Sequence, residues 1–278
     1  MAKDYEKLTL SNDFVFGKVM ENKELCRRVL ETLLQTEIEL TEYPLREKNI
    51  RLSTEGKPIR LDIYVKEEND TLYDAEMQNK NGKSLEMISL PKRSRYYQAV
   101  MDSESLRKGI DYHFLSDSYI IFICTFDPFG QGKYLYTFEN ICREDKELSL
   151  NDRTSKLFFN TKAERSSIPE NIRRLFDYIE DGIIRDKLTR DLDDEVEKLR
   201  KDEGWWAAYM KTVTWEMDAR YEGIEIGRHE GIEIGIEALI RTCQEFNASK
   251  ETTRDKLMQQ FKLSTEAAEE ALNKHWKE

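Results

Sequence analysis

The sequence is poor in the residues that most often build zinc sites and disulfide frameworks. Its cysteines form no Cys-x-x-Cys pair and lie far apart, at Cys26, Cys124, Cys142 and Cys243. The histidines are equally isolated, at His113, His229 and His275. This usage argues against a zinc site and favours a reducing compartment, so we expect a cytoplasmic protein.

Long hydrophobic runs and a basic charge balance are also missing. No apolar stretch reaches the roughly 20 residues that a membrane-spanning helix needs, and the polar start Met-Ala-Lys-Asp-Tyr-Glu-Lys does not resemble a signal peptide. We therefore expect no membrane association. Charged residues make up 36% of the chain and the net charge is −11. If DNA is the partner, local basic patches must overcome this repulsive background.

Residues 59–78 contain two segments in which polar and apolar residues alternate. Such alternation in 59–65 and 72–78 predicts two β-strands, and the polar residues 67–70 between them predict a turn. In an antiparallel hairpin, opposed residue numbers then sum to about 138, and the apolar side chains of both strands share one face. The apolar pairs are Leu61 with Met77, Ile63 with Ala75, and Val65 with Tyr73.

The same register places two carboxylates opposite each other on the other face. Asp62 faces Glu76, with Cβ atoms about 4.5–5.5 Å apart, and Gln78 follows on that face. Facing carboxylates repel each other, and oxygen ligands on rigid strands suit Mg²⁺, which takes one or two protein carboxylates and keeps waters. The alternative interpretation is a solvated hairpin face with incidental charges, because a chain this acidic has many carboxylates.

Flanking segments predict a mixed α/β core over residues 1–165. The expected elements are a helix over 12–34, short strands near 37–40 and 48–52, a helix over 84–101, and strands over 119–126, 133–138 and 157–160. Pro91 must kink or divide the second helix. The segment 119–126 is almost wholly apolar, which is typical of a central strand covered on both faces.

The sequence beyond residue 165 predicts long, charged helices. We divide it into a charged helical region (166–220), a glycine-repeat segment (221–236) and a small helical unit (237–278) with Ser249 and Ser264 as helix caps. Glycines recur every four residues at Gly223, Gly227, Gly231 and Gly235. A helical ridge of glycines permits close packing, for instance against a second copy. Helix-interior glycines cost about 0.8–1 kcal/mol each relative to alanine, so a hinge is the alternative.

Six segments carry a resemblance to a known family. They are Asp13-Phe-Val-Phe-Gly-Lys18, Arg60-Leu-Asp-Ile-Tyr64, Ala75-Glu-Met-Gln78, Leu90-Pro-Lys-Arg-Ser-Arg-Tyr-Tyr-Gln98, Leu106-Arg-Lys-Gly-Ile-Asp-Tyr112 and Tyr119-Ile-Ile-Phe-Ile-Cys-Thr-Phe-Asp127. In this order they resemble the PD-(D/E)XK nuclease family transposases, also called Rpn-type recombination-promoting nucleases. The resemblance covers residues 5–165, and the glycine-repeat tail is also similar to tails in that family.

The resemblance implies a restriction-endonuclease-like core, with a mixed central sheet flanked by helices, that cuts DNA phosphodiester bonds. It implies a divalent metal, Mg²⁺ with Mn²⁺ as the alternative. Asp62 takes the place of the first acid of the motif and Glu76 that of the second, and the carbonyl group of Met77 would complete the metal ligands. Gln78 stands where the motif has a lysine, a substitution that looks usual for this branch, and Leu61 replaces the proline before the first acid. Gln78 can orient a water molecule but brings no positive charge.

The helix after the acids carries candidate DNA contacts. Lys92, Arg93 and Arg95 are placed to clamp phosphates, with Tyr97 beside them. The alternative is a solvated basic face with a core tyrosine.

Three functions compete at this point. The first is a Mg²⁺-dependent DNA endonuclease of the recombination-promoting kind, with Asp62, Glu76 and Gln78 as catalytic residues. The second is a nuclease-derived DNA-binding or regulatory module with weakened chemistry. The third makes the C-terminal helices an oligomerisation device, which the glycine ridge and the tryptophans near residues 205–215 suggest. A homodimer would also bring two active sites to the two strands of DNA.

Overall fold

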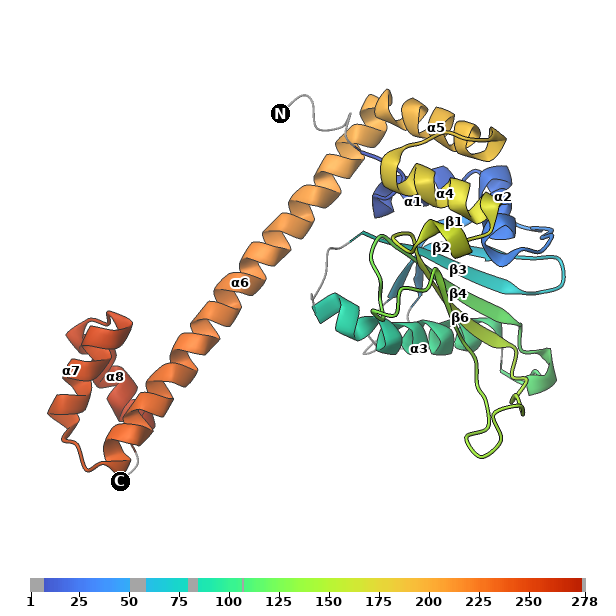
Figure 1. Cartoon of the computed structure of the whole chain (residues 1–278). Coiled ribbons are helices and arrows are strands. Elements are labelled where there is room, and N and C mark those ends of the chain that lie inside the picture. The colour runs from blue at the N-terminus through green and yellow to red at the C-terminus, as the bar shows by residue number, and fades with distance from the viewer. Residues whose placement is uncertain (1–7, 51–58, 80–84, 107, 277–278) are drawn as a thin grey trace. The chain divides into compact units, whose positions relative to one another are not determined.

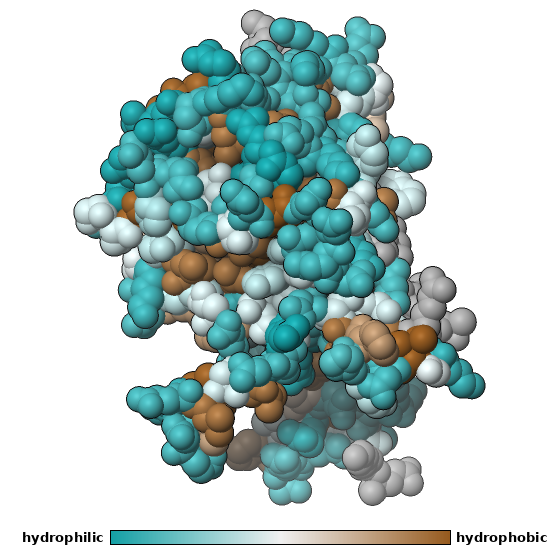
Figure 2. Space-filling model, turned by 90° about the vertical axis from the view of Figure 1, so that its right-hand side faces the viewer, coloured by the Kyte–Doolittle hydropathy of each residue, from teal (hydrophilic) through white to brown (hydrophobic). Residues whose placement is uncertain are grey.

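The computed structural model describes residues 8–50, 59–79, 85–106 and 108–276. The chain divides into two compact units, Met1–Trp206 and Ala207–Glu278. None of the helices in these described ranges is long and apolar enough to cross a lipid bilayer. Figure 2 shows one face of the molecule, where hydrophilic residues predominate and hydrophobic residues lie in patches between them, as the high content of charged residues leads one to expect.

A mixed six-stranded sheet forms the centre of the first unit (Figure 1). Its strands are β1 (Leu45–Ile50), β2 (Ile59–Lys66), β3 (Leu72–Gln78), β4 (Ser118–Cys124), β5 (Leu135–Phe138) and β6 (Thr154–Asn160). They lie in the order β1-β2-β3-β4-β6-β5. The three central strands β3, β4 and β6 are parallel, and β1, β2 and β5 pair antiparallel with their neighbours. The predicted mixed α/β sheet is therefore confirmed.

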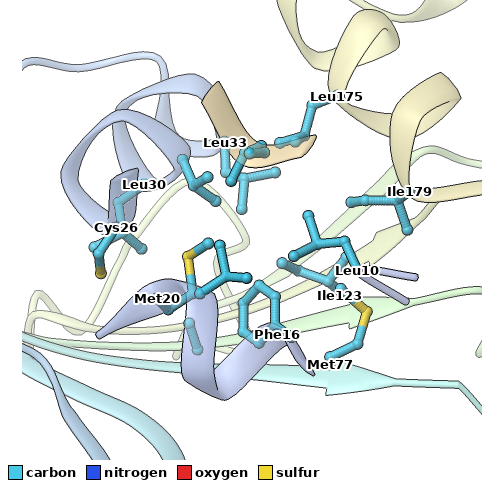
Figure 3. Close-up of a cluster of buried hydrophobic side chains, with 14 of the residues drawn as sticks. Leu10, Phe16, Met20, Cys26, Leu30, Leu33, Met77, Ile123, Leu175 and Ile179 are labelled. Atoms are coloured by element: carbon cyan, nitrogen blue, oxygen red, sulfur yellow. The ribbon is translucent and has the colours of Figure 1, made fainter. Parts of the chain in front are cut away.

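Helices cover both faces of the sheet (Figure 1). They are α1 (Asp13–Met20), α2 (Lys23–Leu34), α3 (Leu85–Ser105), α4 (Glu170–Asp181) and α5 (Lys187–Arg200). Apolar side chains from α1, α2, α4 and α5 pack on one face with Met77 of β3 and Ile123 of β4 (Figure 3). On the other face, α3 contributes Val100 and Met101 to a second core around Phe122.

The hairpin of β2 and β3 has the predicted register, in which Ile63 pairs with Ala75 and Val65 with Tyr73. The expectation of a single buried face was wrong, because α3 covers the second face as well. Leu61 joins the core on the α3 side instead of the core that contains Ile63. The polar residues of the hairpin therefore lie inside the protein, where each charge needs compensation.

The structure gives one helix boundary that was not predicted, and it decides between the alternatives at Pro91. The predicted helix over 12–34 is two helices, because the side chain of Asn22 accepts hydrogen bonds from the N–H groups of Glu24 and Leu25 and so begins α2. Helix α3 continues through Pro91 without division. Leu90, Val100 and Met101 of this helix are buried in the second core.

The two short strands predicted before the hairpin, and the predicted start of α3, differ from or lie outside what the structure describes. The strand predicted near 37–40 is reduced to one bridge between Leu40 and Glu67. The strand predicted near 48–52 begins earlier, at Leu45, and residues 51 and 52 lie outside the described residues. Residue 84, the predicted first residue of α3, also lies outside them.

The second unit contains most of α6 (Glu203–Glu245), together with α7 (Lys250–Phe261) and α8 (Thr265–His275). Ser249 and Ser264 cap α7 and α8, as predicted. A small core holds these helices together: Ile236, Ile240, Leu257, Ala268 and Leu272.

All four repeat glycines lie inside α6, which confirms the helical interpretation of this segment. A Cβ atom added at Gly235 would lie 3.0 Å from a ring carbon of Phe261. Added at Gly223, Gly227 or Gly231, it would meet nothing within 4 Å. Close packing within the second unit therefore explains the fourth glycine and leaves the other three without a reason inside the described part of the chain.

Gly223→Ala and Gly235→Ala should affect stability differently. Alanine is favoured over glycine in a helix by about 0.8–1 kcal/mol, so Gly223→Ala should stabilise the second unit by about that amount. Gly235→Ala should gain clearly less, because the new methyl group must displace the ring of Phe261. Urea denaturation of dilute protein, followed by circular dichroism, measures both. Equal gains at the two positions would contradict the packing of Phe261 on Gly235.

Candidate active site

The hairpin and α3 bring acidic and basic side chains together on the α3 side of the sheet. Glu76 accepts a hydrogen bond at Oε1 from the backbone N–H of Asp62, over 2.9 Å. Glu76 is 2% exposed, and Asp62 is half-buried. Asp62 and Glu76, which the sequence predicted to face each other, are thus in direct contact. The contact joins the carboxylate of Glu76 to the backbone of Asp62.

Arg93 of α3 reaches the second oxygen of Glu76. Its Nη2 donates a hydrogen bond to Oε2 over 3.1 Å. The guanidinium carbon lies 5.1 Å from the ring centroid of Phe122 and 5.4 Å from that of Tyr97. Two aromatic contacts and a charge-assisted hydrogen bond therefore fix this guanidinium beside the acid.

Asp74 is a third acid of the same cluster, and sequence reasoning did not single it out. It lies two residues before Glu76 on β3 and is fully buried, and neither of its carboxylate oxygens has a hydrogen-bond partner among the residues that the structure describes. Burial raises the pKa of Asp74 well above its usual value, and the charges of Glu76 and Asp62 raise it further, whereas Arg93 lowers it. The signal in the sequence was the position of Asp74 in the alternating pattern, on the same face of β3 as Glu76. That signal was weak, because an aspartate on a solvent-exposed face needs no special role.

The remaining predicted site residues differ in how accessible they are. Gln78 is half-buried at the last position of β3, where its carbonyl group accepts a hydrogen bond from the N–H of Thr125 over 3.0 Å. The side chain of Met77 points into the opposite core. Of the four residues predicted to contact DNA, Lys92 and Arg95 are exposed. Arg93 is half-buried against Glu76, and Tyr97 is buried in the second core.

The donor set at this cluster is suited to a divalent cation. Asp62 and Glu76 are in contact and can offer carboxylate oxygens, the hard ligands that Mg²⁺ prefers. Oε1 of Glu76 accepts a hydrogen bond from the N–H of Asp62, and Oε2 accepts one from Arg93. In the described ranges, no three His, Cys, Asp or Glu side chains gather in an arrangement that could hold a metal ion. A metal here would need two carboxylates and further oxygen ligands from the backbone or water.

Asp74→Asn should stabilise the metal-free protein. The raised pKa means that the folded protein holds a proton that the unfolded chain releases, so stability at this site falls as the pH rises above the usual aspartate range. The amide cannot ionise, and we expect a gain of about 1–3 kcal/mol near pH 8 that vanishes near pH 4.

Chemical denaturation in EDTA at several pH values measures this gain. Asp194→Asn, which changes an exposed aspartate of α5, is the matched control and should gain little at any pH. A gain for Asp74→Asn that does not depend on pH would contradict the assignment of the buried carboxyl group.

The sequence model of a family described as "PD-(D/E)XK nuclease family transposase" matches residues 10–171. This segment is more than half of the 278 residues and includes all six strands, the three acids and Arg93. No curated protein and no solved structure matches the chain. The mixed sheet with its flanking helices agrees with the restriction-endonuclease-like fold that the resemblance implied. The chain therefore belongs to the PD-(D/E)XK nuclease family transposases.

Proposed function

We propose that the protein is a divalent-metal-dependent DNA endonuclease of the recombination-promoting kind, acting in the cytoplasm. The observation that carries this proposal is the contact between Asp62 and Glu76 inside the segment that matches a nuclease family. These residues stand at the positions of the two acids of the motif. Their location on adjacent strands, in a cluster rich in carboxylates, is the arrangement that metal-assisted phosphodiester hydrolysis needs.

Asp62 and Glu76, with the carbonyl group of Met77, would hold Mg²⁺ or Mn²⁺. When bound, the ion supplies positive charge that makes a nearby water molecule more acidic and offsets charge on the phosphate. Gln78 would orient the attacking water through hydrogen bonds. Hydrolysis adds this water to phosphorus and breaks one phosphorus–oxygen bond of the DNA strand.

The exposed basic residues of α3 would guide DNA to this cluster. Lys92 and Arg95 are both exposed on the helix that carries Arg93. They can neutralise phosphates and so fix the position of the strand without reading its sequence. Binding of this kind should weaken as the salt concentration rises.

One observation favours the alternative of a DNA-binding or regulatory module with weakened chemistry. Both oxygens of Glu76 accept hydrogen bonds from the protein, and Gln78 brings no charge to the third motif position. Such a module would bind DNA equally well in EDTA and would not cut it.

We further propose that two copies of the chain associate through α6. Residues spaced three and four apart form a stripe along this helix: Met210, Val213, Met217, Arg220, Ile224, Gly227, Gly231 and Ile234. This spacing is typical of a helix–helix seam. Met217, Ile224 and Ile234 are 50%, 53% and 68% exposed, which is unusual for so many large apolar side chains on one helix. A second copy carries the same stripe and would cover them.

The endonuclease activity can be tested with plasmid DNA. Wild-type protein should nick or linearise plasmid when Mg²⁺ is present and should not do so in EDTA. Asp62→Ala and Glu76→Ala should each abolish cutting, because each removes a metal ligand. Asp191→Ala, which removes an aspartate that pairs with Arg28 away from the cluster, is the control and should keep activity. Equal cutting by wild type and by the Asp62→Ala/Glu76→Ala double variant would refute the proposal.

Self-association can be tested at the two glycines of the stripe. Gly227→Ala and Gly231→Ala together should make α6 more stable as a single helix, yet should weaken the dimer because the added methyl groups hold the two helices apart. Light scattering over a range of concentrations measures the dimer. Glu222→Ala, an exposed position away from the stripe, should leave it unchanged. A dimer that is unaffected by both alanines, or a monomeric wild type, would contradict the proposal.

A further inference from the structure

Arg93 is the cation for which the structure describes a contact with the acidic cluster. It does not stand at the third position of the motif, which Gln78 occupies. Gln78 is neutral, so the positive charge that a lysine would bring there is missing. Arg93 lies on α3, 15 positions further along the chain, and donates to Glu76 over 3.1 Å. We infer that Arg93 supplies the positive charge that Gln78 cannot, and that its guanidinium stabilises the charge that develops on the phosphate during hydrolysis. This inference rests on the proposed endonuclease function.

Aromatic contacts hold Arg93 in a position that suits this role. Contacts with the rings of Phe122 and Tyr97 hold the guanidinium in place, so little conformational freedom is lost when it binds a phosphate. The side chain is still 26% exposed, which leaves it accessible from solvent. Lys92 and Arg95, its neighbours on α3, are exposed and make no ion pair within the described parts of the chain.

Unused donors distinguish Arg93 from an arginine that only stabilises the fold. A guanidinium has five N–H groups, and Arg93 makes a single hydrogen bond to the residues that the structure describes. Its Nε is buried and has no hydrogen-bond partner among those residues. A buried donor left unpaired is destabilising, so a purely structural arginine would be expected to use it. A phosphate is a ligand whose oxygens match these free donors.

Arg93 should affect metal binding and the chemical step in opposite directions. As a cation beside Glu76, it opposes the approach of a divalent ion, and Arg93→Gln should therefore tighten metal binding by at least about threefold. The same change removes a fixed donor to the developing charge, and should lower the rate of the chemical step by about 10²-fold. If Arg93 only held Glu76 in place, Arg93→Gln would weaken metal binding and also slow the chemical step, because a disordered Glu76 binds metal less well.

Position 78 offers a test by rescue. Gln78 lies two residues after Glu76 on β3 and shares its face of the strand. A lysine at position 78 would place a positive charge beside the acids from β3, whereas Arg93 reaches them from α3. Gln78→Lys should therefore recover about tenfold in rate when Arg93 is glutamine, and should add little when Arg93 is present.

The experiment compares wild type with Arg93→Gln, Arg93→Lys, Gln78→Lys and the Arg93→Gln/Gln78→Lys double variant. Single-turnover cutting of plasmid gives the chemical rate, and calorimetry with Mn²⁺ alone gives metal affinity. Arg28→Gln is the control for loss of a half-buried arginine, because Arg28 pairs with Asp191 over 2.6 Å and lies outside the cluster. If Arg93→Gln does not fold, as judged by circular dichroism, Arg93→Met takes its place in every comparison, because its unbranched side chain can pack between the two rings.

The expected result is tighter Mn²⁺ binding with slower cutting in Arg93→Gln, partial activity in Arg93→Lys, and recovery in the double variant. Unchanged cutting by Arg93→Gln, weaker Mn²⁺ binding together with slower cutting, or no recovery in the double variant would overturn the inference while leaving the endonuclease in place. Absence of Mg²⁺- or Mn²⁺-dependent cutting by wild type would refute the proposed function and this inference with it.

Discussion

The cluster in which buried Asp74 and Glu76 meet half-buried Asp62 and Arg93 is the constraint around which the first unit is built. Helix α3 covers the face of the sheet that carries these acids, so their charges interact at short range with little screening by water. Burial raises the pKa of Asp74, and the charges of Glu76 and Asp62 raise it further, whereas Arg93 lowers it. A divalent cation bound at these acids would favour their charged forms. The proposed metal-binding role and the stability of the metal-free protein are thus opposed at this site.

The hairpin register could be predicted from sequence because alternation fixes which residues share a face. A slip by one residue would have set the apolar residues of one strand on the face that carries the polar residues of the other, so Ile63 was expected to oppose Ala75, as observed. Glu76 and Asp62 followed from the same arithmetic. The burial of their face could not be predicted in this way, because it depends on α3, which reaches the sheet only through tertiary packing. For that reason Asp74 was missed, and the contact of half-buried Arg93 with Glu76 was not predicted.

Boundaries of helices were less predictable than their existence. The apolar spacing over residues 12–34 is continuous, yet Asn22 caps a new helix because its side chain competes with the backbone for N–H groups. Pro91 lies inside α3 since contacts with the sheet outweigh the hydrogen bond that proline removes. Tertiary packing also acts at Gly235 in the glycine repeat, where the ring of Phe261 lies against the helix backbone.

The most direct test of the central claim is the position of a bound ion. Crystals of the protein grown with Mn²⁺ would locate the ion by its anomalous scattering. Mn²⁺ should give one peak within bonding distance of carboxylate oxygens of both Asp62 and Glu76, with Arg93 still beside them. A peak elsewhere, or saturating Mn²⁺ with none at these two acids, would contradict the central claim.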